Sequence, residues 1–301
     1  MNEQLYQVLG KQKEQVASRK PRLSTEEFVA QMKAKREELY EIANSQVNEI
    51  VSDPQKYLSY LNIQSRFDYT VTNTLLVMKQ CPNATYLKDS AHWRENRCYI
   101  RKGEEGISIL EPEEYTKADG TLGTSYKPKK VFDVSQLSTK IKIDTKTKPN
   151  VYDLMSGLTY DTPVNVQVMD HFNGVTPVYY SPDSKTIFVE NNLEQDVLLQ
   201  GLAREFCYAE CDLQYGTCDH DKDKLLVESA SYILCQKYGI PVSDKGFANE
   251  VKNYFRDAEP KDIKKELTAI KNLYDDVSKR VERGIYKAQQ ERLPNKSEVS
   301  R

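Results

Sequence analysis

Apolar residues recur at helical spacing through residues 24–82 and predict three consecutive helices. Ser24 is followed three residues later by Glu27, which is the pattern of an N-terminal capping box. Asp53, followed directly by a proline, predicts the cap and first residue of a second helix. A third, Leu-rich helix ends at Pro82, because proline disfavours helical backbone in the residue before it.

The pattern then changes to a short helix that carries the only tryptophan, followed by short apolar runs bounded by turn residues. An Asp119-Gly120 pair between two of these runs is a strong hairpin signal. Residues 137–149 are polar and basic, which favours a linker. Strands are predicted at 98–102, 107–111 and 130–136.

The second half of the chain again mixes helical and strand patterns. Strands are predicted at 165–169, 177–180 and 186–190, and helices at 151–158, 193–211, 225–238, 244–256 and 261–290. The last helix is rich in Lys, Glu and Asp, so we expect it to be exposed or to pair with another protein rather than to join a core.

Composition narrows the class of protein. The 301 residues are 39% apolar and 29% charged, and no apolar run is long enough to span a membrane. The N-terminus has no apolar signal-peptide segment, so we expect a cytoplasmic protein with its six cysteines reduced. Residues 1–150 carry 24 Lys and Arg against 20 Asp and Glu, whereas residues 151–301 carry 19 against 25. A polyanionic partner is therefore expected on the first half.

A series of short motifs in the first half resembles the N-terminal domain of ArdC-type antirestriction proteins. The resemblance extends over roughly residues 25–240. The matching motifs, in order, are Asn73, Leu75-Leu76, Pro82-Asn83-Ala84-Thr85, Trp93, the segment from Ile100 to Pro112, and Val131 to Gln136.

The resemblance implies a single-stranded-DNA-binding domain followed by a zinc-metallopeptidase-like domain, carried on conjugative or other mobile elements. The fold class is then α+β: N-terminal helices packed on a small antiparallel sheet, followed by a zincin-like α+β domain. The predicted boundaries are a flexible arm at 1–23, the DNA-binding domain at 24–140, the metallopeptidase-like domain at 150–256, and a C-terminal helix with a polar tail at 257–301.

The metallopeptidase-like domain departs from the family pattern at its zinc helix. Where the family places His-Glu-x-x-His, this chain has Gln200, Gly201 and Arg204, and only Glu228 remains at the position of the third ligand. Arginine cannot be deprotonated to bind a metal and glycine cannot transfer a proton, so we expect no catalysis and no cofactor. We expect Arg204 to form an ion pair with Glu228, with Gln200 as a hydrogen-bonding neighbour. The alternative is that Arg204 points to solvent.

A candidate nucleic-acid surface combines basic and aromatic residues of the first half. Single-stranded DNA needs positive charge for its phosphates and aromatic faces for its bases. The alternative is that Asn73 is a buried hydrogen-bonding hub and that the aromatics belong to the core. The candidates are Tyr69, Asn73, Lys79, Trp93, Arg97, Tyr99, Arg101, Lys102, Lys129 and Lys130.

A rival metal site is offered by Cys207, Cys211, Cys218 and His220, whose residue types suit zinc although their spacing matches no common zinc motif. Isolated helical cysteines are more often small buried apolar residues.

Three functions therefore remain open. The first is a single-stranded-DNA-binding accessory protein of a mobile element with an inactive metallopeptidase-like domain. The second is a zinc-dependent hydrolase that uses the relocated Cys/His site. The third is a module whose acidic C-terminal helices bind a protein. No membrane partner is expected.

Overall fold

The computed structural model describes residues 24–117, 119–139, 148–170 and 176–292. The predicted arm at 1–23 and most of the predicted linker lie outside these residues. Internal contacts divide the chain into two units, one of residues 1–38 and 111–128, the other of residues 39–110 and 129–301. None of the helices described is long and apolar enough to cross a membrane.

The first unit contains the beginning of helix α2 (Thr25–Val51) and the outer part of a hairpin formed by β2 (Ile107–Thr116) and β3 (Leu122–Asp133). The predicted capping box is confirmed: the Ser24 amide donates to Glu27 Oε2 at 2.8 Å, and the Glu27 amide donates to Ser24 Oγ at 3.1 Å. The predicted turn is confirmed as well, with Gly120 at a φ of 81°.

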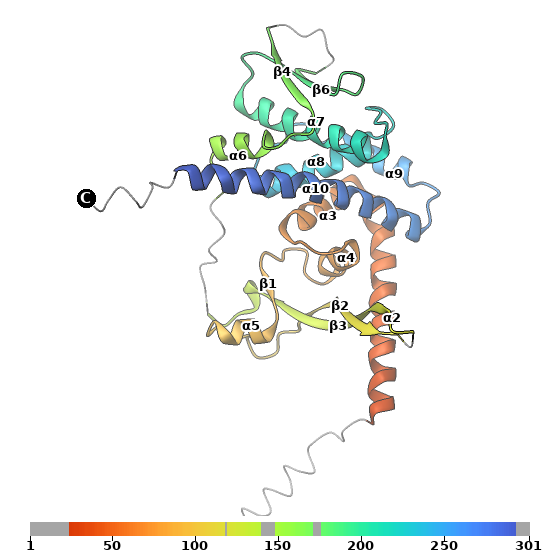
Figure 1. Ribbon diagram of the computed structural model, residues 1–301. Coiled ribbons are helices and arrows are strands. Elements are labelled where there is room, and N and C mark those ends of the chain that lie inside the picture. The colour runs from red at the N-terminus through yellow and green to blue at the C-terminus, as the bar shows by residue number, and fades with distance from the viewer. Residues whose placement is uncertain (1–23, 118, 140–147, 171–175, 293–301) are drawn as a thin grey trace, which may run out of the picture. The chain divides into compact units, whose positions relative to one another are not determined.

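The second unit begins with the rest of α2, followed by α3 (Pro54–Arg66) and α4 (Val71–Gln80) (Figure 1). Asp53 caps α3, as predicted, because its carboxylate accepts hydrogen bonds from two amides of the first turn. Two short elements follow, β1 (Leu87–Lys88) and α5 (Ser90–Glu95), which carries Trp93.

The first sheet has the strand order β1-β3-β2, with β1 antiparallel to β3. Two amide side chains of α4 pair with the outer edge of β2. Asn73 donates to the Leu110 carbonyl and accepts from the Leu110 amide, both at 2.8 Å. Gln80 makes the equivalent pair with Ser108, at 2.9 and 2.8 Å. The side chains thus substitute for a neighbouring strand at an edge that would otherwise lack partners.

The prediction of a strand at 98–102 is wrong: this segment is a loop with a single isolated β-bridge, between Ile100 and Leu137. Arg97 and Gly103 have φ angles of 58° and 92°, which bend the backbone on both sides of the segment. The strand predicted at 130–136 ends early, because residues 134–136 form a 3-10 turn capped by Asp133.

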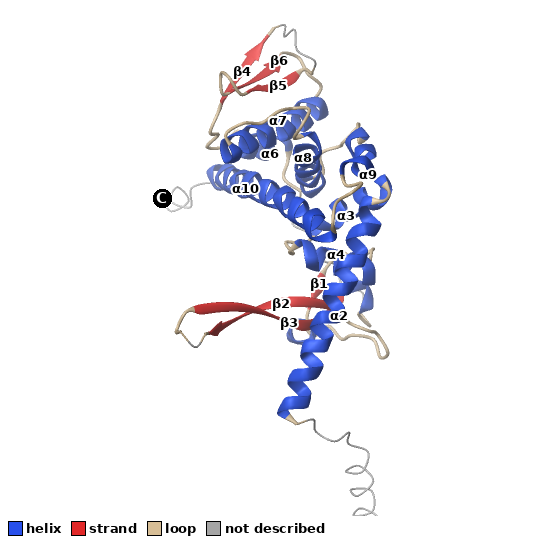
Figure 2. Ribbon diagram, turned by 90° about the vertical axis from the view of Figure 1, so that its right-hand side faces the viewer, coloured by secondary structure: helices blue, strands red, loops and turns tan. Residues whose placement is uncertain are grey.

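The second sheet has the order β4-β6-β5, with β4 parallel and β5 antiparallel to β6. It lies against α7, as Figure 2 shows. The three strands agree with the predicted ones. The elements are α6 (Val151–Leu158), β4 (Asn165–Met169), β5 (Val178–Ser181), β6 (Thr186–Glu190), α7 (Gln195–Tyr215), α8 (Lys224–Tyr238), a 3-10 helix (Gly246–Glu250), α9 (Val251–Tyr254) and α10 (Pro260–Arg292).

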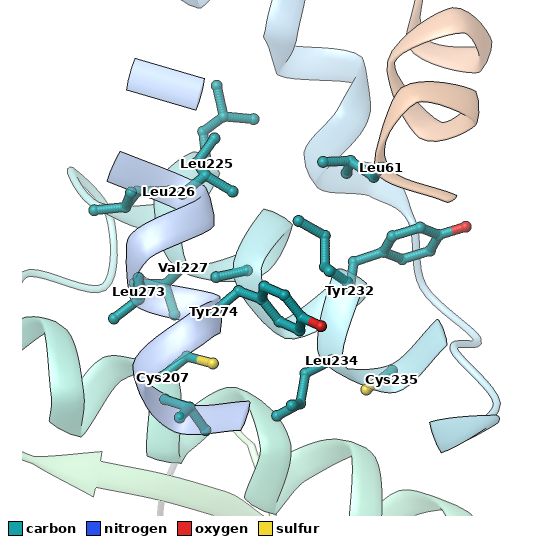
Figure 3. Close-up of a cluster of buried hydrophobic side chains, with 14 of the residues drawn as sticks. Leu61, Cys207, Leu225, Leu226, Val227, Tyr232, Leu234, Cys235, Leu273 and Tyr274 are labelled. Atoms are coloured by element: carbon teal, nitrogen blue, oxygen red, sulfur yellow. The ribbon is translucent and has the colours of Figure 1, made fainter. Parts of the chain in front are cut away.

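The expectation that the last helix stays outside the core is wrong. One face of α10 is fully buried, with Ile263, Leu267, Ile270, Leu273, Val277 and Val281 at 0 or 1% exposure. The helix packs against α6, α7, α8 and α4. Its charged residues occupy the remaining face, so the helix is amphipathic in the ordinary way. Figure 3 shows Leu273 and Tyr274 of α10 within the same apolar cluster as Leu225 and Leu234 of α8.

Candidate functional site

The residues predicted to be a degenerate metal site lie where α7 meets β5 and α8. Gln200 is half-buried and accepts a hydrogen bond from Ser243 Oγ at 3.4 Å. Gly201 is buried against β5, where a Cβ atom would lie 2.6 Å from Val178 Cγ2. Real Cβ atoms do not approach other carbons that closely, so the contact between helix and strand depends on a residue without a side chain. A glutamate has no room at this position.

Arg204 does not form the predicted ion pair with Glu228. Its Nε donates to Glu205 Oε1 at 2.7 Å, and its Nη2 donates to the Val178 carbonyl at 3.2 Å. Burial alone would lower the pKa of Arg204, but Glu205, with a smaller contribution from Glu228, raises it. The prediction was wrong because a carboxylate adjacent in sequence and fully buried competes for the guanidinium.

Glu205 is 0% exposed and is the centre of this region. Its second oxygen accepts the Tyr180 amide at 2.8 Å and lies 3.1 Å from His220 Nε2. Because a buried carboxylate is costly without hydrogen bonds or a counter-charge, this set of contacts is what permits its burial. A signal for it exists in the sequence: an acidic residue at a position where the helical stripe of α7 is otherwise apolar.

His220 is stacked between two tyrosines. Its ring lies 3.9 Å from that of Tyr208 and 4.6 Å from that of Tyr179, with interplanar angles of 27° and 17°. The Tyr208 hydroxyl donates to the His220 carbonyl at 3.2 Å, and burial raises the pKa of Tyr208. We call the set of Arg204, Glu205, Tyr179, Tyr208 and His220 the Glu205 cluster. Both Glu205 oxygens accept hydrogen bonds, which hold the buried carboxylate in place.

Glu228 lies beside this cluster without joining it. Burial raises its pKa; the nearby cations Arg204 and Lys224 oppose the shift, and the carboxylates of Glu205 and Asp244 add to it. Glu228 is therefore a half-buried acid whose position disfavours its charged form.

The predicted four-residue cysteine site is not assembled. Cys207 is buried in the apolar core, near Cys235, whose pKa is raised by burial to about 12 (Figure 3). His220 belongs to the Glu205 cluster instead. Cys211 and Cys218 do lie together, and a hydrogen bond between them raises the pKa of Cys218.

Asp223 completes a group with these two thiols, and sequence spacing had not indicated it. The Sγ atoms of Cys211 and Cys218 and a carboxylate oxygen of Asp223 lie within 4.8 Å of one another. Within the residues that the structure describes, no other group of three His, Cys, Asp or Glu ligand atoms is so close. The trio is called the thiol cluster.

Two of the predicted DNA contacts are buried. Asn73 is 5% exposed and holds the edge of β2, and Trp93 is 2% exposed and donates through Nε1 to the Phe132 carbonyl at 3.0 Å. Both have structural roles that account for them. Tyr69 is half-buried and stacks on Phe67, with ring centres 5.7 Å apart.

The other predicted contacts lie at the surface. Lys79 pairs with Glu49 at 3.5 Å, and Lys129 pairs with Asp89 at 3.0 Å. Arg101 donates to Glu104 and to the Leu137 carbonyl, and Lys130 donates to the Gly106 carbonyl. Three of the predicted contacts are exposed residues of the loop after α5, beside the exposed Arg94 of α5 itself. We call this set the Tyr99 surface: Arg94, Arg97, Tyr99 and Lys102.

A second basic region was not predicted. Four lysines of α10 line a groove of about 790 Å³ together with the beginning of α4 and the exposed ring of Tyr215. Lys264 and Lys265 follow Lys261 by three and four residues and Lys271 follows Lys264 by seven, which places all four on one face of the helix. Helical spacing within 261–271 was a signal for this lysine groove, but the acidic residues of the same helix obscured it. The lysines are Lys261, Lys264, Lys265 and Lys271.

Comparison with known proteins finds similarity of structure but not of sequence. No protein-family model matches the chain, and no curated protein matches it. Solved structures of the antirestriction protein ArdC from plasmid R388 do match. The chain shares the ArdC fold.

The metal-free ArdC structure aligns with a TM-score of 0.55 and the Mn(II)-bound structure with 0.54, each at 15% sequence identity. Each alignment covers 80% of this chain and 98% of ArdC. The α+β class inferred from the sequence and its resemblance to ArdC are thereby confirmed at the level of the fold.

Proposed function

We propose that this chain is a single-stranded-DNA-binding accessory protein of a mobile or conjugative element, with a metallopeptidase-like domain that has lost its catalytic site. Support for DNA binding comes from the fold shared with an antirestriction protein of a plasmid and from the exposed basic and aromatic residues on the described surface.

Support for an inactive domain comes above all from Arg204. Its guanidinium lies between Glu205 and the Val178 carbonyl, at the helical position where the family pattern has its second histidine. A cation there repels a metal ion, and the contact between Gly201 and Val178 leaves no space for a catalytic glutamate one turn earlier. A zincin mechanism needs both the ligand and the base.

The Tyr99 surface has the chemistry that a single strand requires. Tyr99 is 61% exposed, which leaves its ring face open to a base, and Arg97 and Lys102 are exposed on the same loop. Stacking on an aromatic ring contributes about 1–3 kcal/mol per base, and each phosphate contact adds a salt-dependent term. The lysine groove offers a similar combination, with Tyr215 as its aromatic residue.

Fluorescence anisotropy with labelled oligonucleotides tests this proposal and separates the two surfaces. We expect the full chain to bind single strands more tightly than duplex, with a log–log salt slope of about −0.7 per phosphate contacted. Arg97→Ala with Lys102→Ala should flatten that slope by about 1.4 units if both contact phosphates. Lys261→Ala with Lys265→Ala removes the same charge from the groove and should leave the slope unchanged.

The charge-matched control is Lys252→Ala with Lys279→Ala. It removes two exposed lysines that belong to neither the Tyr99 surface nor the lysine groove. Flattening by the groove variant alone would move the site to α10. Equal affinity for single and double strands, or binding indifferent to salt, would contradict the proposal. Proteolysis of an unfolded protein substrate that depends on added Mn(II) or Zn(II) would contradict its inactive-domain part.

A further inference from the structure

The thiol cluster lies near the C-terminal end of α7, about two helical turns beyond Arg204. Cys211 belongs to α7 itself, whereas Cys218 and Asp223 belong to the segment that connects α7 to α8. Both thiols are buried, at 1 and 8% exposure, and Asp223 is half-buried. Asp223 is therefore the most exposed residue of the cluster.

The spacing suits a tetrahedral ion. With metal–sulfur bonds of about 2.3 Å, two tetrahedral thiolates lie about 3.8 Å apart. The three ligand atoms already lie within 4.8 Å of one another, so a shift of about 1 Å or less brings them to bonding distance. Such a shift is within the reach of side-chain rotation and a small movement of the connecting segment.

The carboxylate is oriented by its own loop. Asp223 Oδ2 accepts the Asp219 amide at 2.8 Å, and Asp219 Oδ1 in turn accepts the amides of Asp221 and Lys222 at 2.9 and 3.1 Å. Hydrogen bonds of this kind hold a ligand in place and are typical of the surroundings of metal ligands. They leave the other oxygen of Asp223 available.

Charge around the thiols also favours a cation. Asp223 and Asp212 both place negative charge near Cys218. Asp212 is already engaged with Lys185 and with the Tyr180 hydroxyl, so it supplies charge to the site without being a ligand. The ligand set of two sulfurs and one carboxylate selects thiophilic ions such as Zn(II) over Mg(II), Ca(II) or Mn(II).

We propose that Cys211, Cys218 and Asp223 bind one thiophilic divalent cation of the zinc type. On binding, the two thiols release their protons to solvent and the ion gains two thiolates and a carboxylate, with water in the fourth position. The ion then ties the connecting segment, which carries His220, to α7. This site is separate from the positions of the family's zinc ligands, at Gln200 and Arg204, and does not depend on the proposed DNA binding.

The test titrates the reduced full chain with Co(II) and then with Zn(II). We expect one equivalent of Co(II) to give thiolate charge-transfer absorption in the near ultraviolet, which Zn(II) displaces, and elemental analysis to find one zinc per chain. Cys218→Ser should abolish the absorption, and Asp223→Asn should weaken affinity by about tenfold or more. Cys81→Ser removes a half-buried thiol outside the cluster and should change nothing.

Thermal unfolding keeps the test decisive if a cysteine variant folds poorly, because Asp223→Asn leaves both thiols in place. Zinc should raise the melting temperature of the unsubstituted chain and raise it less in Asp223→Asn. Two results would overturn the proposal: no cobalt absorption in the reduced chain, or binding unchanged by Cys218→Ser. A Cys211–Cys218 disulfide that forms in air as fast with one equivalent of zinc as without it would overturn it as well.

Discussion

The middle and the C-terminal end of α7 differ in how their titratable side chains are paired. At the middle of the helix, Glu205 is enclosed by Arg204, His220 and the Tyr180 amide, and both of its oxygens accept hydrogen bonds. Near the C-terminal end, Cys211 and Cys218 lie together, and the carboxylate of Asp223 lies beside them. The charge at the middle is balanced by the protein's own groups, whereas the thiol cluster contains three potential metal ligands and no cationic side chain.

This difference shows why residue type alone is a poor guide to a site. The Glu205 cluster contains a glutamate, a histidine and two tyrosines, which are common catalytic residues, yet their contacts commit them to one another. What distinguishes a site able to bind something is an atom that remains available once the protein's own partners are counted.

The sharpest test of the Glu205 cluster is Arg204→Met. Removal of the guanidinium leaves a fully buried carboxylate short of its main counter-charge, so we expect the free energy of unfolding to fall by about 3–5 kcal/mol. Urea denaturation measures it. The double variant with Glu205→Gln removes the stranded charge and should recover much of the loss. If Arg204→Met alone lowers the free energy of unfolding by less than about 1 kcal/mol, the interaction of Arg204 with Glu205 is no stronger than an exposed ion pair.

Gly201→Ala tests whether the close contact between α7 and β5 requires glycine at this position. The added Cβ meets Val178 Cγ2 at 2.6 Å, and overpacking of this kind costs about 1–3 kcal/mol. Val178→Ala in the same chain makes room for it, so the pair should be less destabilised than the sum of its two single variants. Strict additivity, measured by the same denaturation, would mean that the helix and strand move apart without difficulty.

Glu228→Gln should have the smallest effect, and of opposite sign. Because burial raises the pKa of Glu228 in the folded protein, the folded state holds its proton more tightly than the unfolded state does. Stability from this group is therefore present at acidic pH and is lost as the pH rises through the folded pKa. Glu228→Gln removes the penalty and should raise the melting temperature at pH 7 by a few degrees, on the order of that for 1 kcal/mol.

Near pH 4, the variant and the unsubstituted chain should melt at similar temperatures. A variant that is less stable than the unsubstituted chain at pH 7 would instead assign Glu228 a favourable charge interaction, of the kind expected between it and Arg204.

Local signals in the sequence predicted most of the helices. The caps at Ser24 and Asp53 and the Asp119-Gly120 turn are formed by residues within three positions of one another, so the sequence alone contains the whole interaction. The loop at 98–102 was mistaken for a strand because the positive-φ residue directly before it is Arg97, and an arginine gives no sign of such a backbone conformation.

The site was less accessible to sequence reasoning, because its partners come from different elements. The departure from the His-Glu-x-x-His pattern at Gln200, Gly201 and Arg204 can be read from the sequence alone. The partner of Arg204 cannot, since Arg204 could reach either Glu205 or Glu228 and only the contact of α7 with β5 decides between them. Asp223 likewise joins Cys211 through the path of the connecting segment, which spacing does not specify.

The burial of α10 has a consequence for how the chain is made. A ribosome releases the N-terminal residues first, so α4, α6, α7 and α8 emerge while the helix that covers them is still unsynthesised. Until residues 260–292 have left the exit tunnel, the apolar surfaces that receive Ile263, Leu267 and Val277 face solvent. During that interval the nascent chain exposes apolar surface of the kind that chaperones bind, and the second unit can close only after most of its own sequence has been translated.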